Sequence, residues 1–276
     1  MTLSVNSNNA ALIALENLNT TQSQLAETQS QISTGLKVGS ARDNASVWAI
    51  AQGQRADISA LDSVQMSLNR ATSIADVAST AGQSISDLLT QLKAKVVSAM
   101  DPSNNTTSRQ LLNNDFRSLL SQITNVVNNA SFDGANILNG SLGASIDFLA
   151  NTDGSSFITL STQNLSLGGG IVTIASTASI STVTLATALL TQVNTSLTQV
   201  DSALGQLGSQ ASEISAHNTF VAKLQDTLTT GVGNLVDANM ASESAKLQAL
   251  QVQQQLGAQA LSIANQAPQV ILSLFK

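Results

Sequence analysis

Residues 186–228 read ATALLTQVNTSLTQVDSALGQLGSQASEISAHNTFVAKLQDTL. Apolar side chains in this stretch return at alternating steps of three and four residues, over about twelve helical turns. The stripe comprises Ala186, Leu190, Val193, Leu197, Val200, Leu204, Leu207, Ala211, Ile214, Asn218, Val221, Gln225 and Leu228. Spacing this strict over so many turns favours left-handed coiled-coil packing over a short globular helix.

Four further segments repeat this spacing on either side of that stretch. The longest runs from Leu61 to Ala99 and follows Asp43, a residue type that caps helix N-termini. A helix from Asp43 to Ala99 would be about 85 Å long at 1.5 Å per residue. Gly35, which follows the first stripe, predicts a helix end there. The shorter stripes occupy residues 11–32, 112–130 and 247–271.

The helical period is interrupted once, between residues 132 and 184. Two apolar segments, 146–149 and 157–160, flank an Asp-Gly turn at Asp153, which predicts a β-hairpin. Residues 171–174 follow three glycines and favour a third strand. The predicted fold class is therefore mainly α: a long antiparallel coiled-coil helical bundle with a small β-hairpin tip around 132–184.

The composition excludes several classes of function. Charged residues make up only 10% of the 276, and the net charge of −6 argues against binding to nucleic acid. The absence of cysteine excludes disulfides and thiolate metal sites. No apolar run is long enough for a membrane span, and the N-terminus does not read as a cleaved signal peptide, so we expect no membrane insertion.

No group of residues predicts catalysis, a cofactor or a metal. His217 is the only histidine and is expected to lie at the rim of a helix. For Asp43 and Asp237, capping or subunit-facing polar contacts are favoured over acid–base chemistry. Gly168–Gly170 lack the Lys-Ser/Thr that a phosphate loop requires. We therefore predict that the chain is not an enzyme, and that it needs no cofactor or metal.

The two outer stripes instead predict self-assembly. They carry almost no charge, and one helix cannot bury its own apolar face. A monomeric bundle is the alternative, but the helix lengths and the uncharged ends favour contacts between copies. The predicted assembly seam comprises Leu15, Leu18, Leu25, Ile32, Leu250, Leu261, Ile271 and Leu272.

Both ends of the chain carry motifs that resemble those of bacterial flagellins, in particular the short alphaproteobacterial type without large outer domains. In the first half, the resemblance rests on residues 31–45 and 49–51, although the family usually has Gly-Leu in place of Val47-Trp48, and on Phe132-Asp133-Gly134 with 137–140. In the second half it rests on residues 235–241, 255–257 and 264–274. The residues matched to the family's turn and terminal motifs are Ser40, Ala41, Asp43, Asn44, Asp237, Ala238, Asn265, Gln266 and Pro268.

The resemblance implies a subunit of the extracellular flagellar filament. Residues 1–40 plus 240–276 would form the inner helices, and residues 41–239 the next shell. The implied partners are further copies, sibling flagellins, hook-associated junction and cap proteins, the type III export apparatus and an export chaperone. The family's hook–filament junction protein is the alternative, although the element at 132–140 favours flagellin.

Overall fold

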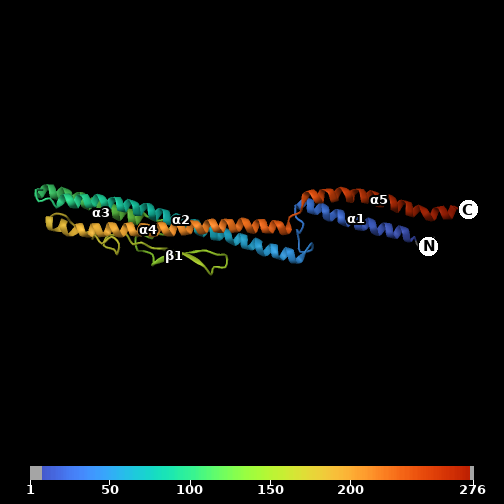
Figure 1. The fold of residues 1–276 in the computed structure, drawn as a ribbon, viewed down its shortest axis with the longest axis horizontal. Helices are drawn as coiled ribbons and strands as arrows, with labels where there is room; N and C mark the ends of the chain where they lie inside the picture. The colour runs from blue at the N-terminus through green and yellow to red at the C-terminus, as the bar shows by residue number, and fades with distance from the viewer. Residues whose placement is uncertain (1–7, 274–276) are drawn as a thin grey trace. The chain divides into compact units, whose positions relative to one another are not determined.

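The computed structural model describes the backbone of residues 8–273 and the side chains of residues 8–266. Figure 1 shows that long helices account for most of this part of the chain. The mainly helical fold with a small antiparallel hairpin is therefore confirmed. The elements are α1 (Asn9–Thr34), α2 (Ala45–Ala99), α3 (Thr106–Asn129), β1 (Ser145–Leu149), β2 (Phe157–Ser161), α4 (Val183–Val236) and α5 (Met240–Ser273).

The chain divides into two compact units. We call residues 1–56 with 227–276 the terminal unit, and residues 57–226 the central unit. The terminal unit contains α1 and α5, whereas the central unit contains α3 and the hairpin. Helices α2 and α4 contribute residues to both units, because each continues through a unit boundary.

The core of the central unit is built on the predicted stripes of α2 and α4. All predicted stripe positions of α2, from Leu61 to Ala99, are buried. The two helices run antiparallel: the Ser86 hydroxyl donates to Asp201 at 3.1 Å, and Asn218 donates to Asn69 at 2.7 Å. The α4 stripe alternates between buried and half-buried positions, as expected for a helix packed along one face.

Helix α3 turns back along α2 and completes this core. The Asn105 side chain accepts the Ser108 N–H at 2.7 Å, which caps the helix N-terminus. Arg109 donates to the carbonyls of Ala99 and Asp101, at 3.1 and 3.0 Å, and so satisfies backbone oxygens around the end of α2. Phe116 is fully buried and is among the largest buried side chains described.

Removing the Phe116 ring should measure how strongly α3 holds the central unit together. We expect Phe116→Ala to lower the free energy of unfolding by about 3–5 kcal/mol, because it creates a cavity in a closed core. The exposed neighbour Ser118 is the matched control, and Ser118→Ala should stay within about 0.5 kcal/mol of the parent. Chemical denaturation followed by far-UV circular dichroism measures both, and equal midpoints for the two variants would contradict the expectation.

The predicted hairpin is present and packs along the sides of α2 and α4. In its antiparallel register Ile146 faces Leu160 and Leu149 faces Phe157. The backbone N–H of Leu149 donates to Ser67 of α2 at 3.2 Å, and Gln210 of α4 donates to the Ser161 hydroxyl at 2.9 Å. These bonds tie β1 to α2 and β2 to α4.

The third strand predicted at 171–174 does not form. Val172 and Ile174 are both buried, which accounts for the apolar residues that predicted a strand. The segment nevertheless has no partner strand. Its backbone is held otherwise: Thr173 N–H donates to the Ser196 hydroxyl at 3.1 Å, and the Ile174 carbonyl accepts from Gly168 at 2.8 Å. It is therefore an irregular segment packed on α4.

Asp43 does not begin α2 as predicted, because Asn44 is the capping residue. The Asn44 side-chain oxygen accepts the Val47 N–H at 3.1 Å. The Asp43 carboxylate instead turns back, and accepts the N–H groups of Gly39 and Ser40 at 3.0 and 2.9 Å. Asp43 thus closes the turn before the helix.

Candidate assembly surface

Two short turns in the terminal unit, one after α1 and one before α5, are hydrogen-bonded to each other. Helix α1 ends at Thr34 and is capped by Gly35, which has φ +72° and donates its N–H to the Gln31 carbonyl at 2.9 Å. Such a left-handed cap favours glycine. Beyond it, Lys37 N–H donates to the Val236 carbonyl at 2.7 Å, and Ala238 N–H donates to the Gly35 carbonyl at 2.9 Å.

These bonds bring the motif turns of the two chain halves into one place. Leu36 pairs with Asp237 in an isolated antiparallel bridge. Asn239 then caps α5, because its side chain accepts the Ser242 N–H at 3.2 Å. Asn265 and Gln266, which belong to the same predicted motif set, lie exposed much further along α5 and do not join this turn. The side chain of Pro268 lies outside the described residues.

Helices α1 and α5 pack against each other as an antiparallel pair. The Asn8 side chain donates to the Ala264 carbonyl at 2.7 Å. A Cβ placed on Gly257 would lie 3.3 Å from the Leu18 methyl carbon and 4.0 Å from the Leu18 Cα. A side chain at position 257 would therefore press on Leu18.

The predicted seam residues divide between the inside and the outside of this pair. On α5, Leu250 is buried and Leu261 half-buried. On α1, the half-buried Leu18, Leu25 and Ile32 are likewise on the covered side, whereas Leu15 is 43% exposed. The side chains of Ile271 and Leu272 lie outside the described residues. Five of the six seam residues whose side chains are described are thus at least partly covered within one chain.

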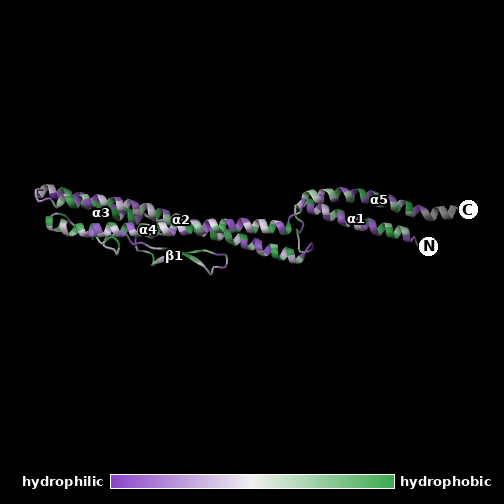
Figure 2. Cartoon of the chain, in the orientation of Figure 1, coloured by the Kyte–Doolittle hydropathy of each residue, from purple (hydrophilic) through white to green (hydrophobic). Residues whose placement is uncertain are grey.

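A second apolar surface, which the stripes did not predict, lies on the outside of the pair. We call it the outer face, and its large side chains are 55–69% exposed. Hydrophobic residues recur along both α1 and α5 (Figure 2). Exposed apolar patches of this kind mark interaction sites. The outer face comprises Val252, Leu256 and Ile263 of α5, whereas Leu12 and Ile13, each 60% exposed, lie on α1 and form a separate exposed site.

The spacing within α5 could have revealed this face. Val252, Leu256 and Ile263 are four and seven residues apart, which places them on one stripe. That stripe is offset by two positions from Leu250 and Leu261, or about 200° around the helix. Helix α5 is therefore apolar on two opposite sides, a pattern typical of helices that are covered on both.

The polar residues considered for chemistry do not converge on a site. The His217 ring N–H donates to the Ala150 carbonyl at 2.8 Å and so braces the hairpin against α4. The backbone N–H and hydroxyl of Ser155 lower the pKa of Asp153, and those of Ser103 lower the pKa of Asp101. Both carboxylates stabilise local turns. Within residues 8–273 no group of three or more His, Cys, Asp or Glu side chains could hold a metal ion.

The close approach at Gly257 offers a direct test of the α1–α5 pair. We expect Gly257→Val to destabilise the terminal unit by about 1–3 kcal/mol, since the added methyls would collide with Leu18. Gly231 is the matched control, because it is also helical, lies in the same unit and has no atom within 4 Å of an added Cβ. Amide hydrogen exchange in α1 is the measurement, and similar exchange rates for both variants would contradict the prediction.

Comparisons with known proteins cover almost the whole chain. Residues 5–142 match the family model of the bacterial flagellin N-terminal helical region, and residues 190–275 match that of the C-terminal helical region. The chain is 51% identical to the flagellin FljJ of Caulobacter vibrioides, over 100% of this chain and 99% of that one. It is 39% identical to a flagellin of Brucella melitensis, over 99% of both chains.

A solved structure agrees on the fold. The crystal structure of Bacillus cereus flagellin is similar with a TM-score of 0.50 at 20% sequence identity. The similarity covers 56% of this chain and 88% of that one. None of the helices described here is both long and apolar enough to cross a membrane.

The long antiparallel helices and the two matched family models define a class, that of helical structural proteins. The chain belongs to the bacterial flagellin family. It is a structural subunit of the flagellar filament. The hook–filament junction alternative is not favoured, because relatives that match over nearly the whole chain are flagellins.

Proposed function

We propose that copies of this chain polymerise through the outer face of the α1–α5 pair. The observation that carries this proposal is the exposure of Leu256 and Ile263, at 58% and 69%, on a helix whose opposite side is already packed. Fully burying such a side chain contributes about 1.5–3 kcal/mol. The predicted seam residues, such as Leu18 and Leu250, then act by holding the pair together so that it presents this face.

We also propose separate places for the two units in the filament. Residues 1–40 with 240–276 would form the inner core, and residues 41–239 the next shell, as the family resemblance implies. The support from the chain itself is that the outer face belongs to the terminal unit. The segment between residues 132 and 184 is too short to add an outer domain with a core of its own.

The remaining partners follow from the family. We propose that sibling flagellins share the filament, and that junction and cap proteins bind its ends. We propose export through the flagellar type III apparatus, with an export chaperone and without a cleaved signal peptide, to an extracellular position. Nucleic acid binding, membrane insertion and catalysis have no part in this proposal, and the acidic net charge of −6 agrees with the first of these exclusions.

Seeded polymerisation tests this function directly. Purified chain is mixed with short filament fragments and examined by electron microscopy, with fragments alone and chain alone as controls. Long helical polymers that grow only in the mixture are the expected result. A chain that stays monomeric at every concentration in the presence of competent fragments would overturn the proposal.

A further inference from the structure

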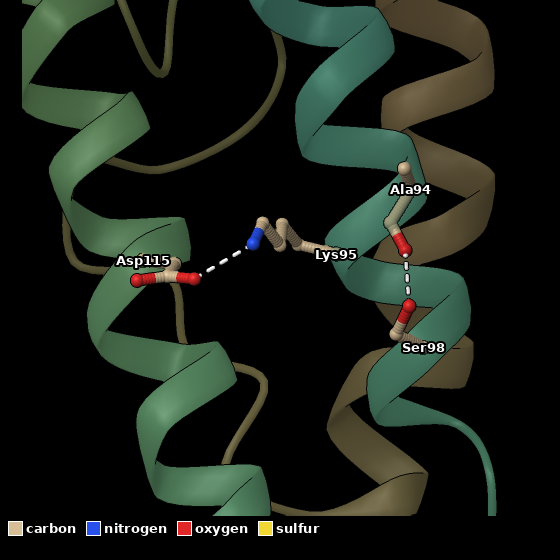
Figure 3. A network of polar contacts seen from close by, with 4 residues as sticks. All are labelled: Ala94, Lys95, Ser98 and Asp115. Carbon is tan, nitrogen blue, oxygen red and sulfur yellow. Dashed lines mark hydrogen bonds and ion pairs between the residues drawn. The ribbon is translucent and has the colours of Figure 1, made fainter.

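Helix α3 accompanies the long helices of the central unit over only part of their length. In its first half, Asp115 accepts from Lys95 of α2 at 2.7 Å, as Figure 3 shows. At its end, Asn125 and Asn129 line one groove together with Thr80 of α2. Because α3 ends at Asn129, the α2–α4 pair continues without it beyond the level of Thr80, toward the start of α2.

The end of α3 coincides with glycines in both long helices. A Cβ placed on Gly82 of α2 would lie 2.6 Å from a methyl carbon of Leu204 on α4, so these two positions face each other. Gly82 is two residues from Thr80, which lies beside the end of α3. Next to Leu204, α4 carries Gly205 and Gly208. The α2–α4 pair therefore loses its third helix where both of its own helices contain glycine.

We call residues 203–217 of α4 the transition segment. It reads ALGQLGSQASEISAH, with two glycines and three serines, which favour helix less than alanine does. Neither Gly205 nor Gly208 has a positive φ, and an added Cβ would meet no side chain or other element within 4 Å. Neither packing nor backbone conformation within the described chain therefore requires these glycines. Their effect is to make this part of α4 more flexible.

The hairpin region supports the transition segment from one side. The Gln210 side chain accepts the Ser161 N–H at 3.3 Å and donates to the Ser161 hydroxyl at 2.9 Å. Gln163, just after β2, donates to Gln206 at 3.1 Å. The His217 ring is bonded to the backbone just after β1 at 2.8 Å. Because positions 206, 210 and 217 are four and seven residues apart, all these contacts lie along one side of α4.

The opposite side of the transition segment borders an open groove between α2 and α4. The volume of this groove is about 500 Å³. Ser212, which lines it, is two residues from Gln210 and therefore about 200° around the helix. The side chains that α4 contributes to the groove are all small, so they offer little resistance to a change in curvature. They are Ala211, Ser212, Ser215, Ala216 and Thr219.

We propose that the transition segment is a bending point of α4, and that the hairpin region is the splint that keeps it helical and straight. Sharp helix bends are found at Gly/Ser pairs, and Gly208-Ser209 is such a pair. Up to the end of α3, a third helix supports the α2–α4 pair. Beyond that point, hydrogen bonds from the hairpin region replace it, and their loss would let α4 open or bend toward the groove. The device belongs to a single chain and does not depend on polymerisation.

Amide hydrogen exchange of the monomer, followed by mass spectrometry, tests the splint. Gln206→Ala combined with Gln210→Ala should speed exchange in the transition segment about tenfold or more, because the supporting bonds are lost. Alanine is the better helix former, so a change in helix propensity cannot explain this loss. Adding Gly205→Ala and Gly208→Ala to the same chain should return exchange to within about threefold of the parent, since both positions have room for a methyl group.

A matched pair of glycines elsewhere is the control for the rescue. Gly53 and Gly231 are also helical and have open space around an added Cβ, but they lie outside the transition segment. Replacing both by alanine in the double glutamine variant should not restore protection. Equal rescue by this control pair would overturn the bending point, because a general gain in helix stability would then explain it. Failure of the Gly205 and Gly208 replacements to rescue would overturn it as well.

Helix α3 around Phe116 is the internal reference, and its exchange should be the same in every variant. Parent-like exchange of the transition segment after loss of both glutamines would show that the hairpin region gives no support. Equal acceleration in α3 would show a global loss of stability instead of a local one, and would also overturn the proposal. If the double variant does not fold, Gln206→Ala and Gln210→Ala are measured singly, each with an expected acceleration of about threefold in the transition segment.

Discussion

Ile263→Asp is expected to abolish filament elongation while leaving the isolated chain folded. Ile263 is 69% exposed, so a carboxylate there costs little in the monomer. In the proposed polymer the same position is covered by a neighbouring copy, where an unpaired charge is strongly unfavourable. A penalty of about 3 kcal/mol per subunit raises the concentration needed for growth more than 100-fold.

The adjacent residue provides the control for this experiment. Ser262 is also exposed but lies about 100° around α5 from the outer face. Ser262→Asp should therefore elongate seeds nearly as well as the parent. Light scattering with electron microscopy measures growth, and far-UV circular dichroism checks folding. Normal elongation by Ile263→Asp would remove the outer face from the assembly mechanism.

The second large effect is expected in the protease sensitivity of the two chain ends. We predict that residues 1–34 and 247–276 are cut rapidly in the monomer and protected in the filament. Thr28 and Leu250 are the only buried side chains described for α1 and α5, so the pair gains little from burial. Ordering each residue costs about 1–2 kcal/mol of backbone entropy, and such helices therefore open readily.

Polar atoms inside the pair add to this marginal stability. The buried side-chain oxygens of Thr28 and Gln31 have no hydrogen-bond partner among the residues described. Each such group costs about 1–3 kcal/mol. Contacts with neighbouring copies in the filament would offset these costs, so that folding of the ends is coupled to association.

The protease for this comparison must be broad in specificity. The chain has no Lys or Arg before Lys37, so trypsin could not report on α1. Subtilisin digestion followed by mass spectrometry should yield a trimmed fragment from the monomer and the intact chain from the filament. The central unit, with Phe116 and Leu68 fully buried, is the internal control in both samples. Equal resistance of the ends in monomer and filament would contradict the prediction.

The central core was predictable because its stripes are long and strictly spaced. From Leu61 to Ala99 the large apolar residues lie on one side of the helix. If the helix were rotated so that another side faced the core, most of these residues would be exposed, so the sequence specifies which side is buried. Irregular segments gave less reliable signals. Val172 and Ile174 alternate like a strand, but each is buried singly against the helices and neither has a partner strand.

The phase of α1 shows where hydrophobicity alone misleads. The predicted stripe passes through Leu15, whereas the half-buried or buried positions of α1 instead include Ala14, Thr21 and Thr28. Positions 14, 21 and 28 are seven residues apart and stay in phase with Leu18 and Leu25 on the covered side of α1. The covered side of α1 therefore carries these small residues and leaves out Leu15. The outer face was not predicted because only one apolar stripe was assigned to each helix. A second apolar side of the same helix was therefore not considered.

The antiparallel α1–α5 pair has a further consequence for the order in which the chain can fold. Asn8 meets the carbonyl of Ala264, a contact that spans 256 positions of sequence. Contacts between residues this far apart form late, because a long loop must close before they contribute. During synthesis, α1 leaves the ribosome early and has no partner helix until nearly all of α5 has been translated. The central unit can fold first, and the first helix to be made is among the last to be packed.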